Sequence, residues 1–254
     1  MRKRILTTIG LCTALLVWTL LSASGVVSAL FLPGPVRVTN ALVSLFTHDA
    51  FLTDIGVSLA RVALGFVLST LVALPEGIGL GASRTCAALL DPLLSCLRYV
   101  PPVVFIPLAI VWFGVGEFEK ISIIFIATVP YLTVLIADTI GNQRRALAHV
   151  ARTLGASRLQ VVTRIALPGA LPAIWDASRV MIGSSWTFVT AAEMVGASTG
   201  LGSVIIASQR FLRTDQIFAV IITIGALGLL TDALFRWSYR AFFPWSEKSH
   251  AASQ

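Results

Sequence analysis

The sequence predicts an all-α polytopic membrane protein with six transmembrane helices. Of its 254 residues, 56% are hydrophobic and only 12% are charged, and the mean hydropathy is +0.87, whereas an average soluble domain carries about 25% charged residues. Several apolar runs reach the roughly 20 residues that a helix needs to cross a bilayer with its backbone satisfied. The period-two alternation that a transmembrane β-barrel requires is not evident.

A single transmembrane domain over residues 1–254 accounts for the pattern, with no internal repeat. The expected spans cover residues 5–30, 54–80, 91–113, 121–140, 175–194 and 218–237. The first run follows a basic triplet and ends near a Val-Ser-Ala sequence, as a signal peptide also would. Its apolar stretch is longer than the core of about 7 to 15 residues in a signal peptide, which favours a retained helix.

The distribution of basic residues predicts the orientation. Twelve Lys and Arg residues lie in the N-terminus, the segment near residue 84, the loop 141–174 and the tail, against four in the opposite loops. Because cytoplasmic loops carry the excess of Lys and Arg, both termini of this multi-pass inner-membrane protein are expected in the cytoplasm. The net charge of +7 therefore reflects membrane topology and gives no reason to expect nucleic acid as a partner.

Polar and helix-breaking residues within the spans mark candidate pathway positions. Prolines interrupt the third span, and lipid-facing helices rarely tolerate such lesions, so we expect a broken segment that lines a cavity. Arg61 lies inside the second span, where a contact with a neighbouring helix and a contact with the solute are both open interpretations. Helix packing is an alternative role for each of the others. The candidate pathway residues are Arg61, Arg98, Tyr99, Pro101, Pro102, Phe105, Pro107, Tyr131, Trp186, Thr190 and Glu193.

The segment 148–175 is the one long polar interruption of the apolar pattern. Residues 147–154 follow amphipathic-helix spacing, and Gly155 stands where a C-terminal cap would be. Ser157 opens a capping-box pattern, which predicts a second short helix that ends before Pro168. The resulting apolar ridge would either dock into a groove on another protein or lie on the anionic inner leaflet.

A family resemblance favours docking. The segment is similar to the EAA signature, E-A-A-x3-G-x9-I-x-L-P, of permease subunits of ATP-binding-cassette (ABC) importers, and it matches at Ala151, Gly155, Ile165, Leu167 and Pro168. His149 and Val150 replace the Glu and Ala of the first two positions. The stretches SLARVALGF, DPLLSCLRYVPPVVFIPLAIVWFGVGE and AAEMVGASTGLG resemble the branch that serves nitrate, sulfonates and taurine, and the likeness covers about residues 30–238.

The resemblance implies the fold and partners of a type I ABC importer permease. It implies a small oxyanion as solute, a homodimer of permeases in membrane lipid, an extracytoplasmic substrate-binding protein and separate ABC ATPase subunits. ATP and Mg²⁺ would bind to the ATPase, so this chain is expected to be no enzyme, with no catalytic residue, metal site or cofactor of its own. The residues it assigns to ATPase coupling are Ala151, Leu154, Gly155, Ala156, Ser157, Ile165, Leu167 and Pro168.

Three alternatives differ in solute or mechanism. An importer of the same type could carry a vitamin or a pyrimidine precursor. An ATP-independent secondary transporter should show more spans or an inverted repeat. An intramembrane hydrolase needs a base beside its nucleophile, and no histidine lies within a span to activate Ser184.

Overall fold

The computed structural model describes residues 2–48 and 50–246; Met1, Asp49 and the tail 247–254, which contains Lys248, lie outside the described residues. Every regular element within the described ranges is helical. The elements are α1 (Arg2–Ala23), α2 (Pro35–His48), α3 (Phe51–Ala82), α4 (Arg84–Tyr99), the 3₁₀ turn η1 (Pro102–Phe105), α5 (Ile106–Phe113), α6 (Glu117–Thr153), α7 (Arg158–Gln160), the π-helical turn η2 (Val161–Ala166), α8 (Leu167–Met194), α9 (Leu201–Arg210) and α10 (Thr214–Phe242).

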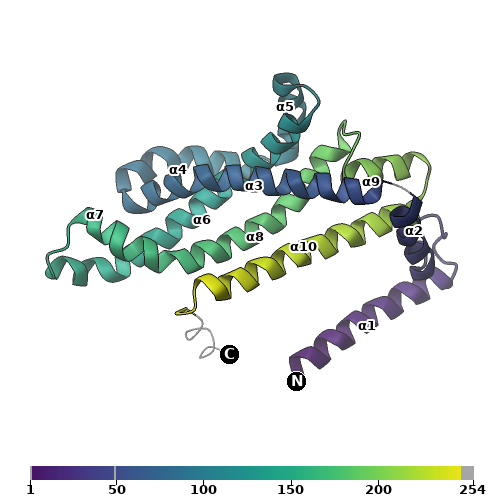
Figure 1. Ribbon diagram of the computed structural model, residues 1–254, viewed down its shortest axis with the longest axis horizontal. Coiled ribbons are helices and arrows are strands. Elements are labelled where there is room, and N and C mark those ends of the chain that lie inside the picture. Colours follow the sequence, from purple (N-terminus) through teal and green to yellow (C-terminus); the bar gives the residue numbers. More distant parts are fainter. Residues whose placement is uncertain (1, 49, 247–254) are drawn as a thin grey trace.

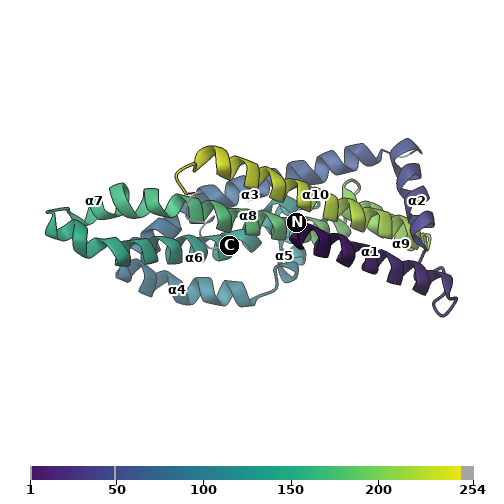
Figure 2. The same cartoon turned by 90° about the horizontal axis from the view of Figure 1, so that it is seen from below.

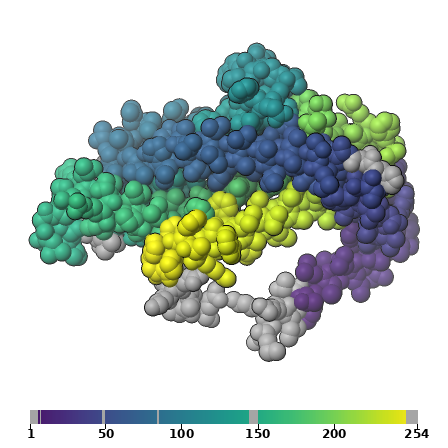
Figure 3. Space-filling model, in the orientation of Figure 1, coloured from purple at the N-terminus to yellow at the C-terminus, as the bar shows by residue number. Residues whose placement is uncertain are grey.

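The long helices form an elongated bundle with two distinct ends (Figures 1 and 2). α6 packs against α3 and α8, and α8 packs in turn against α10. The short helix α7 lies at one end of the bundle, and α2 and α9 lie at the other. We call these the α7 end and the α9 end. In the space-filling view α5 stands out from the surface formed by α3 and α4 (Figure 3).

Glycines allow α3 and α6 to approach closely. A Cβ atom added at Gly65, Gly77 or Gly81 would come within 2.7, 2.6 and 2.7 Å of atoms of α6. Small residues at helix contacts are typical of membrane bundles, where backbones pack closely in the absence of a hydrophobic driving force. α3 and α6 therefore form a closely packed pair of helices, and both carry polar side chains of the site described below.

Three of the described helices are long and apolar enough to cross a membrane, over residues 51–82, 117–143 and 214–242. A fourth span is possible if α4 and the η1–α5 segment, which meet at an angle of 91°, count as one broken span. This break lies at the prolines where the sequence predicts it. The number of six spans stays a prediction, because the apolar part of α1 is shorter and α8 is not among the described helices that are long and apolar enough to cross a membrane.

The element boundaries differ from the expected spans most clearly at α1, which ends at Ala23 instead of near residue 30, at the connection between α6 and α8, and at α9. α6 begins before residue 121 and runs on to Thr153, so the first part of the expected loop 141–174 belongs to this helix. α8 begins at Leu167, so only residues 154–166 lie between α6 and α8. Within this connection, the short α7 is the one stretch of regular α-helix. α9, which follows the Gly/Ser-rich segment near residue 200, was not expected.

Candidate functional site

Charged side chains meet near the α9 end of the bundle. α3 contributes Arg61, which is 2% exposed, and α8 contributes Glu193, which is 1% exposed. Arg61 Nη1 donates a hydrogen bond to Glu193 Oε1 at 2.8 Å, and Arg61 Nε donates to Glu117 Oε2 of α6 at 2.7 Å. Arg61 Nη2 donates to the other oxygen of Glu117, so this contact is bidentate. We call Ser58, Arg61, Glu117 and Glu193 the Arg61 cluster; it joins α3, α6 and α8.

Protein donors replace water around Glu193. Ser58 Oγ lies 2.8 and 2.9 Å from its two carboxylate oxygens, and the backbone N–H of Gly202 donates to Oε2 at 2.9 Å. A buried charge is tolerated only when it is paired and its hydrogen bonds are satisfied, and here both conditions hold. Glu117 differs, because its side chain is 59% exposed.

The loop between α8 and α9 closes over the Arg61 cluster. Thr199 O accepts a hydrogen bond from Arg61 Nη1 at 2.8 Å, and the Gly200 N–H donates to Asp54 Oδ1 of α3 at 2.7 Å. Gly200 has a φ of +107°, and a Cβ atom there would lie 2.4 Å from Glu193 Oε1. Glycine alone fits both this backbone conformation and the available space.

A second buried ion pair occupies the first turns of α6. Lys120 Nζ donates to Glu119 Oε2 at 3.0 Å and to Gly116 O at 3.1 Å. Glu119 is 0% and Lys120 is 2% exposed, and Glu119 Oε1 has no hydrogen-bond partner among the described residues. This pair adds further charge at the α9 end, where the expected span 121–140 would have left both residues in a loop.

The broken segment α4–η1–α5 brings two of the candidate pathway residues together. α4 ends at Tyr99, and the hydroxyl of Tyr131 on α6 donates to the carbonyl oxygen of Arg98 at 2.6 Å. A carbonyl freed at a helix end thus finds a side-chain partner. Tyr99 itself is 87% exposed, so the break presents an aromatic ring at the surface of the chain.

The candidate pathway residues fall into three groups by exposure. Arg61, Trp186 and Glu193 are buried, and Trp186 Nε1 donates to Thr231 Oγ1 of α10 at 3.4 Å. The half-buried residues are Arg98, Pro102, Phe105, Tyr131 and Thr190, and the exposed ones are Tyr99, Pro101 and Pro107. Arg61 and Glu193 both have hydrogen-bond partners within the chain. Of the two interpretations of Arg61, the contact with a neighbouring helix is the one that its geometry matches.

The predicted turn after residue 154 has the expected cap. Gly155 has a φ of +85°, and the N–H of Ala156 donates to Ala151 O at 3.0 Å in a Schellman arrangement. Ser157 and Gln160 form a complete capping box that starts α7. Ala151 is 6% exposed, but Leu154 is 82% and Leu159 is 71% exposed. The turn therefore displays apolar side chains on a rigid, self-capped backbone.

The prediction that the second helix ends before Pro168 is wrong. The chain instead passes from α7 through the π-helical turn η2 directly into α8, with Pro168 in the first turn of α8. Proline lacks the N–H that would continue an α-helical ladder, and a widened π turn just before it lets the helical path proceed. Pro168 is exposed and Ile165 and Leu167 are half-buried.

Ser58, Asp54 and Glu117 were not predicted from the sequence as members of a site. Asp54, Ser58 and Arg61 follow one another at helical spacing, so a polar stripe on one face of an apolar helix was available as a signal. Glu117 carried no such signal, because it lay outside the expected span. Its role appears only when α6 is seen to begin at this residue.

Comparison with known proteins gives a consistent family match. The family model described as "Binding-protein-dependent transport system inner membrane component" matches residues 65–245. A probable ABC transporter permease protein of Brucella abortus (strain 2308) is 37% identical over 232 residues, which cover 91% of this chain and 92% of the relative. The taurine transport system permease protein of Escherichia coli K12 is 32% identical over 249 residues, covering 96% and 90%.

A relative with another solute in its name is equally similar. The bicarbonate transport system permease protein of Synechococcus elongatus is 32% identical over 243 residues, which cover 91% of this chain and 86% of the relative. Among solved structures, an inward-facing conformation of the MetNI methionine ABC transporter aligns with a TM-score of 0.67 and 19% sequence identity, covering 75% of this chain and 94% of that one. The last likeness concerns the fold alone.

Proposed function

Because this chain belongs to the family of binding-protein-dependent transport system inner membrane components, and is thus a multi-pass ABC importer permease rather than an enzyme, we propose that it couples to a separate ATPase through the α6–α8 turn. We further propose that it forms the pathway for a small oxyanion. The observation that carries the coupling proposal is the exposure of Leu154 and Leu159 on a self-capped turn.

The shape of this turn supports docking to a protein. Exposed apolar residues on a fixed helical turn suit a groove in a partner, because little conformational entropy is lost on binding. The sequence contains no G-x-x-x-x-G-K-[ST] motif, so the energy of ATP would arrive through this contact. The residues proposed to make or position it are Ala151, Leu154, Gly155, Ala156, Ser157, Ile165, Leu167 and Pro168.

The same proposal assigns a direction to the bundle. Arg152, Arg158 and Arg164 lie around the α7 end, and an excess of basic residues marks the cytoplasmic side. The α7 end and both termini are therefore proposed to face the cytoplasm. The α9 end then faces outward, where a substrate-binding protein would deliver the solute.

The solute class is proposed from the cationic groups and the relatives. Arg98 Nε at the broken segment is buried without a hydrogen-bond partner among the described residues, and it offers a donor to an anion. Two identical copies of the permease would enclose the pathway with the exposed face of α4, η1 and α5, including Tyr99, Pro101 and Pro107. Taurine and bicarbonate both remain candidates, because the relatives named for them are equally identical to this chain.

Transport in proteoliposomes tests the proposal. The purified permease is reconstituted with its ATPase and its binding protein, and uptake of radiolabelled taurine, nitrate, bicarbonate and a neutral vitamin is followed with and without ATP. We expect uptake of one of these three solutes, each of which carries an oxyanion group, only when both ATP and the ATPase are present. Uptake that persists without any ATPase would contradict coupling and favour a secondary transporter, whereas uptake of a neutral vitamin alone would contradict the oxyanion class.

A further inference from the structure

A polar hollow of about 400 Å³ lies between α2 and the first turn of α10, and we call it the α2–α10 hollow. Two guanidinium groups line it, those of Arg37 and Arg213, and neither has a carboxylate within ion-pair distance among the described residues. The volume lies in the range of about 300–1,000 Å³ that is typical of small-ligand sites. The lining residues are Arg37, Asn40, Ala41, Ser44, Arg213, Asp215 and Gln216.

α2 presents one polar face to this hollow. Arg37, Asn40 and Ser44 follow one another at intervals of three and four residues, which places them on one face of the helix. Val38 and Leu45 lie in the apolar core instead, where they are 2% and 3% exposed. The apolar face therefore fixes α2 to the bundle, and the polar face lines the hollow.

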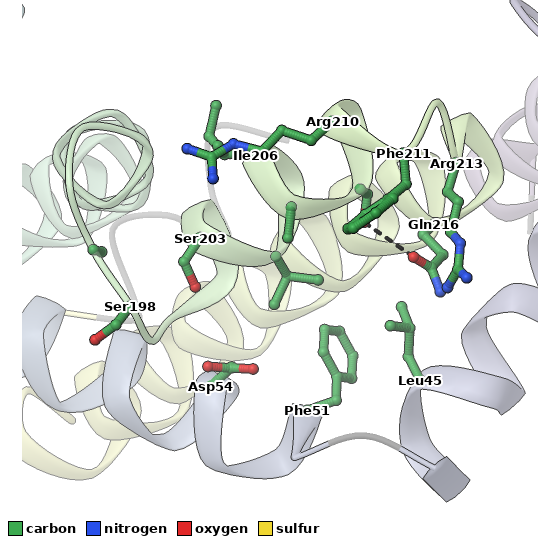
Figure 4. A pocket seen from close by; sticks show the side chains of 14 residues that line it. Leu45, Phe51, Asp54, Ser198, Ser203, Ile206, Arg210, Phe211, Arg213 and Gln216 are labelled. Carbon is green, nitrogen blue, oxygen red and sulfur yellow. Dashed lines mark hydrogen bonds between the residues drawn. The ribbon is translucent and has the colours of Figure 1, made fainter.

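The start of α10 supplies the opposite wall. Ser208 Oγ donates a hydrogen bond to Gln216 Oε1 at 3.1 Å, which leaves the amide N–H₂ group of Gln216 to donate to a ligand. Arg213 and Gln216 also line a second hollow, of about 430 Å³, and lie at its end away from Ser198 (Figure 4). Asp215 Oδ1 already accepts the Gln216 N–H at 3.0 Å. With two guanidinium groups against one carboxylate, the α2–α10 hollow carries net positive charge.

This wall stands at the end of a membrane-spanning helix. Residues 214–242 are long and apolar enough to cross a membrane, and the hollow is lined by the first turn of this helix. Trp18 of α1 stacks on Phe218 of α10 with ring centroids 6.0 Å apart, and its Nε1 donates to Pro33 O at 3.1 Å. Tryptophan is enriched where a span meets the headgroup region. The hollow therefore lies at the level of the lipid headgroups.

α2 has the character of a helix that lies in the membrane surface. It runs across the end of the long helices (Figures 1 and 2). Besides its polar face it exposes apolar side chains, with Val36 73%, Val43 56% and Phe46 42% exposed. A helix of this kind places its apolar residues at the boundary of the acyl chains and its polar residues among the headgroups. A phospholipid beside α2 can thus contact both kinds of residue.

We propose that the α2–α10 hollow binds the phosphate group of an anionic phospholipid such as phosphatidylglycerol. Arg37 and Arg213 donate charge-assisted hydrogen bonds to the phosphate oxygens, and the Ser44 hydroxyl and two side-chain amides offer neutral donors. The bound headgroup links α2 to α10. This inference goes beyond the proposed function, because it depends neither on the solute nor on the ATPase. The proposed orientation decides only that the lipid belongs to the outer leaflet.

A phospholipid fits the hollow better than a free anion does. Both arginines are exposed, and an exposed charge contact contributes little by itself. A lipid adds contacts between its acyl chains and Val36 and Val43, and it is already confined to the membrane surface. Basic pockets between membrane helices bind the headgroups of anionic lipids for these reasons.

Amide hydrogen exchange of the permease–ATPase complex tests the site locally. The complex is placed in phosphatidylcholine nanodiscs with increasing fractions of phosphatidylglycerol, and exchange is followed at residues 35–44 and 214–217. We expect phosphatidylglycerol to slow exchange there in the wild type. Arg37→Gln and Arg213→Gln should each raise the fraction of phosphatidylglycerol that gives half of this protection by roughly three- to fivefold.

Two further variants make the test specific. Arg210→Gln removes the same charge at an exposed residue that does not line this hollow, and it should change the half-point by less than about twofold. Asp215→Asn removes the carboxylate of the hollow, so it should lower the half-point about two- to threefold. Unchanged exchange in α3 and normal co-purification of the ATPase control for folding.

Three results would overturn the site. One is the absence of any slowing by phosphatidylglycerol in the wild type, and another is an equal half-point in the wild type, Arg37→Gln and Arg213→Gln. The third is equal protection by inorganic phosphate added to pure phosphatidylcholine nanodiscs, because the hollow would then bind a free anion. None of these results bears on ATP-dependent uptake, so failure of the site and failure of the proposed function are distinguishable.

Discussion

The two ends of the bundle use polar groups in opposite ways. At the α7 end, backbone caps hold a turn whose apolar side chains, Leu154 and Leu159, are mostly exposed. At the α9 end, the Arg61 cluster buries charges that join three long helices. The first arrangement leaves its surface free for a partner, and the second uses its strongest interactions within the chain. Substitutions at the two ends should therefore affect different properties.

Two of the positive-φ glycines make the same comparison at single residues. Gly155 and Gly200 both have backbone conformations that disfavour side chains. A Cβ atom at Gly155 would meet no atom within 4 Å, whereas one at Gly200 would collide with Glu193 and Arg61. Conformation alone restricts Gly155, but conformation and packing both restrict Gly200. The first glycine shapes a surface and the second permits a buried contact.

The largest effect is expected from Glu193→Ala. This change leaves the buried guanidinium of Arg61 with the exposed Glu117 as its one carboxylate partner among the described residues, and breaking a buried ion pair costs about 3–5 kcal/mol. Unfolding in mixed micelles by increasing sodium dodecyl sulfate measures the loss. Glu117→Ala is the matched control, because this carboxylate is 59% exposed and can be replaced by water. Equal losses for the two variants would contradict the assignment of the buried contact as the stabilising one.

A smaller but clear difference is expected between the glycines. Gly200→Ala should lower the free energy of unfolding by more than Gly155→Ala, for which we expect about 1–2 kcal/mol from the left-handed backbone alone. The same micelle titration gives both values. A loss at Gly155 as large as that at Gly200 would show that the two turns are equally packed.

Replacement of Gly155 by valine should uncouple the importer with a modest loss of stability. A β-branched residue opposes the positive φ of the turn, so residues 154–157 would lose their shape while the membrane helices stay folded. Co-purification of the ATPase and ATP-dependent uptake measure the effect. If both remain at wild-type levels, the conformation of this turn does not matter for coupling.

Removal of the α7 cap should have the smallest effect on stability. Ser157→Ala deletes one half of the capping box, at a cost of about 0.5–2 kcal/mol confined to this helix start. Amide hydrogen exchange should be faster at residues 158–160 and unchanged in α3. Ser203→Ala, which removes a hydroxyl that donates to Gly200 O in the first turn of α9, is the control at the other end.

Local structure at the α7 end and at the proline break was predictable, whereas the contacts at the α9 end were not. The cap at Gly155, the capping box at Ser157 and the break at the prolines depend on residues a few positions apart, and the structure has all three. Arg61 and Glu193 are 132 residues apart, and their pairing depends on how α3 and α8 pack. Periodicity marks a polar face on a helix, but it does not identify what that face contacts.

The binding of purified ATPase to permease variants in nanodiscs shows whether the α7-end turn is the docking surface for the ATPase. Leu154→Ser and Phe211→Ser each replace an exposed apolar side chain with serine, one at each end of the bundle. We predict that Leu154→Ser lowers ATPase affinity about tenfold or more without changing the unfolding midpoint, and that Phe211→Ser leaves ATPase affinity unchanged. Wild-type ATPase affinity for Leu154→Ser, or an equal loss for both variants, would contradict the claim.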